Sequence, residues 1–341
     1  MRGIQFFLMV AALTGLAGPT FAQNSKPKAP GKMVDVGGYN LYLDCRGQGS
    51  PTVILESGLD DSSAAWGAVQ PEIAKFTQVC SYDRAYIGFS DAGPVPWTLH
   101  QQVFDLHQLL KAANIPGPYV LVGQSLGGLL NQLYKSLYSA DVAGMILVDS
   151  TSVNSKMGDK PLRSAAKGVP VPSAQTMATS PPPPLTPEEQ ANLDKALPRL
   201  AKEVEGTLPN PYDKLPAEAK VVWRWEHSHP KMHPGSNNPM LTYWAEEMEL
   251  MHREWQGKEH VYGDMPLYVL AAARASSDAD RLREVNDMAL MSTNSLLLLD
   301  PQSDHDMHID VPSVVIQPIL QVVEAVRAGI RLDASSPFGL Q

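Results

Sequence analysis

The stretch YVLVGQSLGG, residues 119–128, sets an apolar, strand-like run directly against a serine flanked by glycines. Gly123 stands two residues before Ser125, and Gly127 two residues after it. The segment that follows, LGGLLNQLYKSLY, begins at residue 126 and has apolar residues at helical spacing. The pattern predicts a strand, a sharp turn and a helix. The serine is displayed on the turn, where only glycines leave room for it.

Strand-like and helical patterns alternate on both sides of this turn. Apolar runs typical of strands occupy residues 40–45, 52–57, 77–82, 144–149, 266–273 and 295–300. Helical patterns lie near residues 100–115 and 279–291 and in VVIQPILQVVEAVRAG at the C-terminal end. Mostly apolar runs are typical of strands that helices cover on both faces. The order predicts an α/β fold with a doubly wound, mostly parallel sheet.

Residues 151–257 differ from the rest of the chain. The Pro-rich stretches VPVPS and SPPPPLTPEE separate short helical segments, and the whole is too long for a connecting loop. We expect a helical, Pro-rich cap inserted into a core made of residues 23–150 and 258–341. Apolar side chains that fit either a pocket or the cap's own core are Trp223, Trp225, Trp244, Trp255, Met232, Met240, Met248 and Met251.

The N-terminus has the pattern of a secretory leader. Arg2 precedes the apolar run FFLMVAALTGLAG, and PTFA offers a small-residue cleavage site after Ala22. The run is shorter than the ~20 residues of a membrane-spanning helix, although an uncleaved anchor is the alternative. We expect residues 1–22 to be removed and the mature chain to be exported, without stable membrane insertion.

Composition narrows the choice of partners. The chain has 341 residues, is 44% hydrophobic and carries a formal net charge of -9. An acidic chain without a basic surface is a poor binder of nucleic acid or of an anionic membrane. Cys45 and Cys80 lie in separate strand-like runs, and an exported protein permits a disulfide between them. Two buried free thiols are the alternative, and two cysteines alone make a poor metal site.

A serine hydroxyl is a weak nucleophile at neutral pH. It needs a base, usually histidine, which a carboxylate orients. His305 lies just beyond the last strand-like run, in LLLLDPQSDHDMHIDVP, where a loop brings it over the sheet edge. His308 is the nearest competitor. The alternative interpretation of this stretch is an acidic loop with a metal-like DHDMHID cluster.

Five segments together resemble a known family. In chain order they are VILESGLDDSSAAW, CSYDRAYIGFSD, LVGQSLGG, MILVDS and SDHDMHIDVP. They resemble the α/β-hydrolase superfamily in its capped serine-hydrolase branch, over about residues 35–150 and 260–330 but not across the cap. The resemblance implies a sheet of about eight strands with a cap after the sixth, a Ser-acid-His triad, no cofactor, and hydrolysis of esters or related bonds.

The resemblance also assigns positions around the nucleophile. The oxyanion is stabilised by backbone amides, which by position are those of Leu59 and Leu126. Gln124 stands where many relatives have histidine, and Ser57 and Gly58 stand where many have a His-Gly pair. The strands that hold the two cysteines are usually adjacent in this fold, which favours the Cys45–Cys80 disulfide.

The triad carboxylate has three candidates. In the family it most often follows the seventh strand, about eight residues after the proline that opens it; counted from Pro266, that place is Arg274. Asp278 and Asp280 come later, near the start of a predicted helix, where capping or first-turn service is ordinary. Asp149 ends the sixth strand, a position that a minority of relatives use. We take Asp149 as the acid, with Asp280 and Asp278 as alternatives.

Two other groups of ionisable residues are not predicted to form a catalytic or metal site. Asp83 and Arg84, at a strand end, are predicted to serve as a structural ion pair. A histidine triplet, His227, His229 and His233, has the look of a metal site. Pro230 interrupts the helix that would align these ligands, and no carboxylate or cysteine completes the set, so no metal is predicted.

The sequence thus predicts a serine hydrolase that cleaves a carboxylic ester of a small to medium, largely apolar substrate through an acyl-enzyme. Lactone, thioester, amide or peptide hydrolysis and cofactor-free perhydrolysis by the same triad are alternatives. An aspartate nucleophile, which dehalogenases and epoxide hydrolases of the superfamily use, is absent from the turn. A non-catalytic binding protein that keeps the fold is an alternative of another class.

Overall fold

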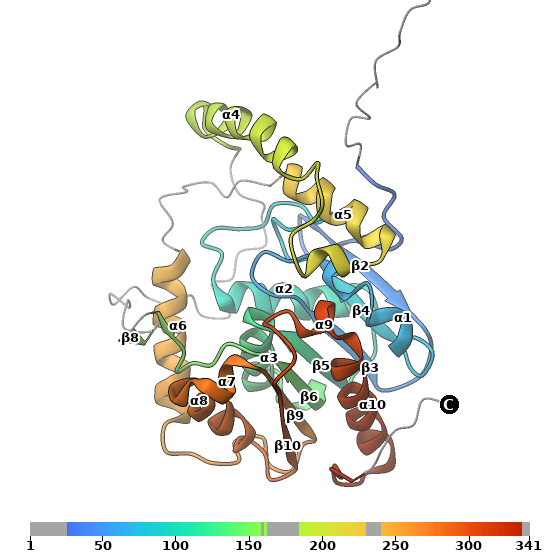
Figure 1. The fold of residues 1–341 in the computed structure, drawn as a ribbon, viewed down its shortest axis with the longest axis vertical. Helices are drawn as coiled ribbons and strands as arrows, with labels where there is room; N and C mark the ends of the chain where they lie inside the picture. The colour runs from blue at the N-terminus through green and yellow to red at the C-terminus, as the bar shows by residue number, and fades with distance from the viewer. Residues whose placement is uncertain (1–25, 158–159, 162–183, 230–239, 336–341) are drawn as a thin grey trace, which may run out of the picture.

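The computed structural model describes residues 26–157, 160–161, 184–229 and 240–335, and the predicted leader lies outside them. An eight-stranded sheet has the order β1-β2-β4-β3-β5-β6-β9-β10 (Figure 1). Its strands are β1 (Lys32–Asp35), β2 (Asn40–Arg46), β3 (Thr52–Glu56), β4 (Val79–Tyr82), β5 (Tyr119–Gln124), β6 (Val142–Val148), β9 (Leu267–Ala272) and β10 (Ser295–Asp300). β2 runs antiparallel to β1 and β4, and all other neighbours are parallel. The predicted doubly wound, mostly parallel sheet is confirmed.

The sequence pattern missed one strand of this sheet. β1 is only four residues long, lies at the sheet edge and buries only Val34, so it carries almost no apolar signal. β5, in contrast, is buried along its whole length at the centre of the sheet. A separate two-stranded pair joins β7 (Lys156–Met157) to β8 (Lys160–Pro161).

Helices cover both faces of the sheet. The core helices are α1 (Gln70–Ile73), α2 (Leu99–Ala112), α3 (Leu126–Leu137), α7 (Arg274–Ser277), α8 (Ala279–Ala289), α9 (Met307–Asp310) and α10 (Pro312–Ala328), with short 3-10 turns η1 (Ser63–Trp66) and η2 (Ser139–Asp141). α2, α3 and α8 bury one apolar cluster, which includes Leu106 and Leu129. α1 and α10 bury a second on the other face, which includes Ile73 and Ile319. Among the described helices, none combines the length and apolarity needed to cross a bilayer.

In the described residues between β6 and β9 lie three further helices. They are α4 (Pro187–Glu203), α5 (Ala217–Ser228) and α6 (Met240–Trp255), with the 3-10 turn η5 (Tyr212–Lys214) between the first two. In Figure 1, α4 and α5 lie at the top of the view and α6 at the left. Leu208, Leu215 and Trp223 from this region pack against Ala65 of η1 and Ile309 of α9.

α6 is built into the core. Trp244, Met248 and Met251 are buried in the same cluster as α2 and α3, so these cap side chains serve packing rather than a pocket. Glu247 is fully buried and accepts hydrogen bonds from the backbone amides of Leu99 (2.7 Å) and His100 (2.9 Å) at the start of α2. A carboxylate at a helix N-terminus satisfies free amides and complements the helix dipole. Met232 lies outside the described residues.

A disulfide joins the antiparallel edge of the sheet to its parallel part. Cys45 of β2 lies directly opposite Cys80 of β4, and their sulfur atoms are bonded. The two residues are 35 positions apart in the sequence. A cross-link of this span removes conformations from the unfolded chain, so it stabilises the native state.

We expect replacement of both cysteines, Cys45→Ala with Cys80→Ala, to lower the free energy of unfolding by about 2–4 kcal/mol, because the unfolded chain regains its freedom. Urea denaturation without reductant measures the change. Dithiothreitol should lower the stability of the wild type by a similar amount and leave the double variant unaffected. Equal stability of the wild type with and without reductant contradicts the prediction.

Candidate active site

Ser125 lies on the tight turn that joins β5 to α3; this turn is the elbow. Its backbone has φ 53° and ψ -118°, a conformation that costs a non-glycine residue about 1–3 kcal/mol. The Ser125 amide donates to the carbonyl of Val148 (3.1 Å), and the Ser125 carbonyl accepts from the amide of Thr151 (2.9 Å). The end of β6 therefore holds the turn in its strained shape.

Close backbone contacts explain the glycines around the serine. A Cβ placed on Gly123 would lie 2.5 Å from the carbonyl carbon of Gly127, and one on Gly127 would lie 2.4 Å from the carbonyl oxygen of Glu56. Both glycines are thus required by close approach, as the sequence pattern indicated. A Cβ on Gly128 would lie 2.1 Å from Ser150 Oγ, a further contact that the pattern did not reveal.

His305 and Asp149 meet at the same edge of the sheet. His305 Nδ1 lies 2.5 Å from Asp149 Oδ2. The carboxylate is fully buried, whereas the imidazole is 36% exposed. Because an ionised carboxylate only accepts hydrogen bonds, we assign a proton to Nδ1; in the neutral form of the ring, Nε2 then carries the lone pair.

Two arginines contact the same carboxylate. Arg281 Nη2 lies 2.9 Å from Asp149 Oδ1, and Arg274 Nη2 lies 2.9 Å from Asp149 Oδ2. Burial opposes the charge of Asp149, but the hydrogen bond from His305 and the charges of Arg281 and Arg274 outweigh it and hold the pKa of Asp149 well below its usual range. Asp149 is therefore ionised across the working pH range of most proteins.

The other two candidate acids, Asp278 and Asp280, lie at the start of α8 and interact there. The Asp278 side chain caps the helix and accepts from the amides of Asp280 and Arg281. Asp280 pairs with Lys156 (2.5 Å) and Arg283 (2.9 Å). Among the described residues, neither carboxylate forms an ion pair or hydrogen bond with His305. Of the three candidates, Asp149 is the one that does.

His308, the competing histidine, is fully buried. Its ring lies 4.5 Å from that of Trp66, centroid to centroid, and neither ring nitrogen has a hydrogen-bond partner in the described part of the chain. Burial lowers the pKa of His308 to about 3. A neutral, enclosed imidazole of this kind serves packing.

Gln124 connects the elbow to residues 301–306, the loop that carries His305 and is named the histidine loop. Its Nε2 donates to the His305 carbonyl (3.2 Å) and to Asp306 Oδ1 (3.2 Å). Within the residues that the structure describes, no hydrogen bond joins the Ser125 hydroxyl to His305. The elbow and the histidine loop therefore meet through Gln124.

The loop after β3 is held by a buried arginine. Arg84 pairs with Glu56 (2.7 Å) and donates to the carbonyls of Ser57 (2.7 Å), Gly58 and Leu59 (2.7 Å). In the described part of the chain, the amides of Leu59 and Leu126 have no hydrogen-bond partner.

The predicted pairing of Asp83 with Arg84 needs correction. The ion-pair partner of Arg84 is Glu56, because the guanidinium turns toward the end of β3. Asp83 accepts from the backbone amides of Ser63 (2.7 Å) and Phe89 (2.8 Å) instead. The Asp83 carboxylate therefore holds the start of η1 and the turn at Phe89.

A second buried carboxylate lies beside the loop after β3. Asp61 Oδ1 accepts from the Tyr212 hydroxyl of η5 (3.1 Å). Burial and the charge of Asp306 raise the pKa of Asp61 to about 6. Burial also raises the pKa of Asp306 itself. Asp61 therefore titrates in the mildly acidic range.

The histidine triplet does not converge in the described residues. His227 Nδ1 lies 2.8 Å from the Trp223 carbonyl, and His229 Nδ1 lies 3.0 Å from the Trp225 carbonyl, each within α5 or at its end. His233 lies outside the described residues. The two described rings therefore contact their own helix backbone.

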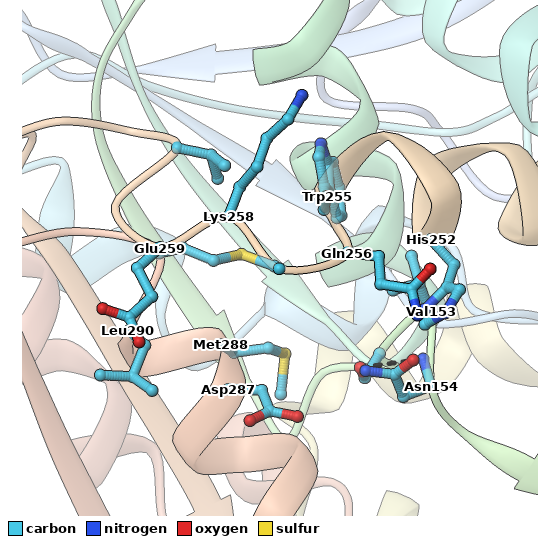
Figure 2. Close-up of a pocket in the computed structure, with 14 residues that line it drawn as sticks. Val153, Asn154, His252, Trp255, Gln256, Lys258, Glu259, Asp287, Met288 and Leu290 are labelled. Atoms are coloured by element: carbon cyan, nitrogen blue, oxygen red, sulfur yellow. Dashed lines mark hydrogen bonds between the residues drawn. The ribbon is translucent and has the colours of Figure 1, made fainter.

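A cavity of about 310 Å³ lies at the junction of α6 with the core. Figure 2 shows side chains that line it. Val153 and Asn154 come from the segment after β6, Trp255 from the end of α6, and Asp287 and Met288 from α8. The residues of the elbow and the histidine loop are not among those that line it. Trp255 therefore lines a cavity, and this cavity lies apart from the elbow.

Comparison with known families agrees with this geometry. A model described as the alpha/beta hydrolase family matches residues 53–317. The uncharacterized protein YqjL of Bacillus subtilis is 35% identical over 104 residues, which cover 30% of this chain and 41% of YqjL. The chain therefore matches less than half the length of that relative.

Solved structures extend the likeness to almost the whole fold. A bromoperoxidase from Bacillus anthracis superposes with a TM-score of 0.55 at 17% identity, covering 86% of this chain and 99% of its own. A thermophilic esterase from Thermogutta terrifontis gives a TM-score of 0.54 at 19% identity, with 87% and 98% covered. At such identities the likeness concerns the fold alone.

The raised pKa of Asp61 predicts a pH-dependent stability. Between about pH 4 and 6 the native state binds more protons at Asp61 than the unfolded chain does, so the free energy of unfolding falls as pH rises. Asp61→Asn lacks this decline. The free energy of unfolding of Asp61→Asn, minus that of wild type, should therefore rise by about 2–3 kcal/mol between pH 4 and pH 7. Urea denaturation at each pH measures this difference.

The exposed neighbour Asp60 provides a matched control. Asp60→Asn removes the same charge from the same loop and should show no such gain. A stability difference between Asp61→Asn and wild type that stays constant across this range contradicts the assignment.

Proposed function

The chain belongs to the alpha/beta hydrolase family, and on that basis we propose that it is a serine hydrolase that cleaves carboxylic esters. Family and fold indicate a hydrolase that acts on a small molecule. The observation that carries the ester proposal is the 2.5 Å contact of His305 with the buried Asp149, at the sheet edge where Ser125 occupies a strained turn. A nucleophile, a base and an orienting acid are the parts that acyl transfer needs.

In the first half of the proposed reaction, Ser125 Oγ attacks the carbonyl carbon of the ester. His305 Nε2 takes the hydroxyl proton, while Nδ1 keeps its hydrogen bond to Asp149. The exposed imidazole closes the remaining gap to Ser125 once substrate is bound, as catalytic hydrogen bonds often do. The protonated imidazole then gives its proton to the departing alcohol, which leaves an acyl-enzyme.

The amides of Leu59 and Leu126 are proposed to stabilise the negative oxygen of the tetrahedral intermediate. Three features support them: neither amide is engaged elsewhere among the described residues, Arg84 binds the carbonyls of the loop that carries Leu59, and Leu126 begins α3. In the second half, His305 takes a proton from water, which attacks the acyl carbon. Collapse of the second intermediate releases the carboxylic acid and restores the Ser125 hydroxyl.

We propose an uncharged ester of small to medium size as the substrate. Four carboxylates lie in the two loops beside the elbow, namely Asp60, Asp61, Asp304 and Asp306. They disfavour an anionic substrate by charge repulsion. Lactones, thioesters and amides could donate the acyl group in place of an ester, and peroxide could accept it in place of water. Assays with each of these compounds distinguish the alternatives.

We also propose that the mature chain is exported after loss of residues 1–22. The leader pattern supports this location. So does the Cys45–Cys80 disulfide, because such bonds persist in oxidising compartments.

Ser125→Ala should abolish hydrolysis of short and medium p-nitrophenyl esters, with a fall of about 10⁶-fold in kcat, because the nucleophile is lost. A fluorophosphonate probe followed by peptide mapping should label Ser125 in the wild type. Ser136→Ala, an exposed serine of α3, is the matched control and should keep full activity. Absence of labelling in the wild type would favour the non-catalytic binding protein.

Asp149→Asn should lower kcat by about 10⁴-fold, because the amide no longer holds the correct tautomer of His305. Asp280→Asn should stay within about twofold of wild type, since Asp280 pairs with Lys156 and Arg283. Steady-state kinetics on the same ester compares them. Near-normal turnover by Asp149→Asn moves the acid role to another carboxylate.

A further inference from the structure

We propose that Arg274 is a positioning residue that, together with Arg281, sets the pH range in which His305 works as the base. The inference rests on the proposed mechanism, since it concerns the same His305–Asp149 pair. It adds two guanidinium groups, from α7 and α8, to the three residues of the triad.

The contacts show how closely Arg274 is coupled to the imidazole. Arg274 Nη2 lies 2.9 Å from Asp149 Oδ2 and 3.4 Å from His305 Nδ1. The same carboxylate oxygen lies 2.5 Å from His305 Nδ1. Arginine and histidine therefore share one oxygen of Asp149, and each takes part of its negative charge.

Arg281 holds the other side of the carboxylate. Its Nη2 lies 2.9 Å from Asp149 Oδ1 and also 2.9 Å from the Ser150 carbonyl, while its Nη1 lies 3.0 Å from Glu284 Oε2. The Arg281 side chain is only 9% exposed, so this clamp is part of the interior. Two guanidinium groups thus balance the two carboxylates of Asp149 and Glu284.

Other groups face His305 from the elements around it. Asp304 and Asp306 flank it in its own loop, and the Asp304 carboxylate accepts from the His305 amide (2.8 Å). Buried His308 interacts with it electrostatically from α9. Asp61 acts on the same loop through Asp306. Within the described residues, Arg274 and Arg281 are the arginines of this set.

A positive charge next to the imidazole opposes its protonation. When His305 accepts a proton, the imidazolium lies beside the Arg274 guanidinium and competes with it for Asp149. Removal of Arg274 leaves this carboxylate less neutralised, which favours the protonated ring. Arg274 therefore keeps His305 available as a base at lower pH than Asp149 alone would allow.

Because Arg274 is largely exposed, it can be replaced without a large effect on folding. Its side chain is 54% exposed, and Asp149 keeps the buried Arg281 and His305 as partners without it. Replacement of Arg274 therefore leaves no unpaired buried charge. Salt screens an exposed charge more than a buried one, so the effect of Arg274 should depend on ionic strength.

The test measures the titration of the His305 ring by NMR in Arg274→Gln, with histidines labelled at Cε1 and the resonance assigned by its loss in His305→Asn. At low ionic strength the midpoint should move up by about one pH unit relative to wild type, and by less at 0.5 M salt. The acidic limb of kcat/KM should move in the same direction. The NMR signal reports this ring alone, which separates it from Asp61.

Two variants serve as controls. Arg274→Lys keeps the charge and should retain a midpoint closer to wild type than Arg274→Gln does. Arg283→Gln removes the same charge from α8 at a side chain that is 69% exposed and paired with Asp280, and it should leave the midpoint unchanged.

Equal midpoints in wild type and Arg274→Gln overturn the proposal, as does an equally large shift in Arg283→Gln. The ring titration needs no turnover. A wild type that resists fluorophosphonate labelling therefore counts against the serine hydrolase, while the NMR midpoints still decide the role of Arg274.

Discussion

The close approach of α3 to the end of β3 is the constraint on which the site depends. At Gly127 the helix backbone lies so near the Glu56 carbonyl that no side chain fits between them. This contact, with the Ser125–Val148 hydrogen bond, forces Ser125 into a positive φ and brings the start of α3 beside the loop that leads to Leu59. Packing of backbone against backbone thus fixes the turn that displays Ser125.

Two buried ion pairs flank this contact. Glu56 with Arg84 supports the loop after β3, and Asp149 with Arg281 supports the histidine side. Burial of such charges is costly, and it is tolerated when each group is also hydrogen-bonded. Arg84 meets this condition through three loop carbonyls, and Arg281 through Ser150 and Glu284. The polar interior therefore serves to orient the site.

The helices between β6 and β9 attach to the core by different means. α6 is pinned through Glu247 at the start of α2 and through the Trp244 indole, whose Nε1 donates to the Trp97 carbonyl (3.2 Å). α5 rests on η1 through an apolar cluster that includes Trp223. Tyr212, between α4 and α5, donates a hydrogen bond to Asp61 in the loop after β3. This region is therefore tied to the loop after β3 by a hydrogen bond.

The sequence by itself determined the parts whose signal is local. Glycine spacing around Ser125 and the apolar runs predicted the tight turn and the sheet, because steric limits and periodicity act over a few residues. That His305, after the last strand, acts as the base stays a prediction. Only the tertiary structure decided which charges meet. Asp149, Asp278 and Asp280 look alike in sequence, yet Asp149 alone of the three contacts His305, 156 positions away. Arg274 joins Asp149, and Arg84 pairs with Glu56 rather than Asp83, because such contacts depend on how distant segments pack.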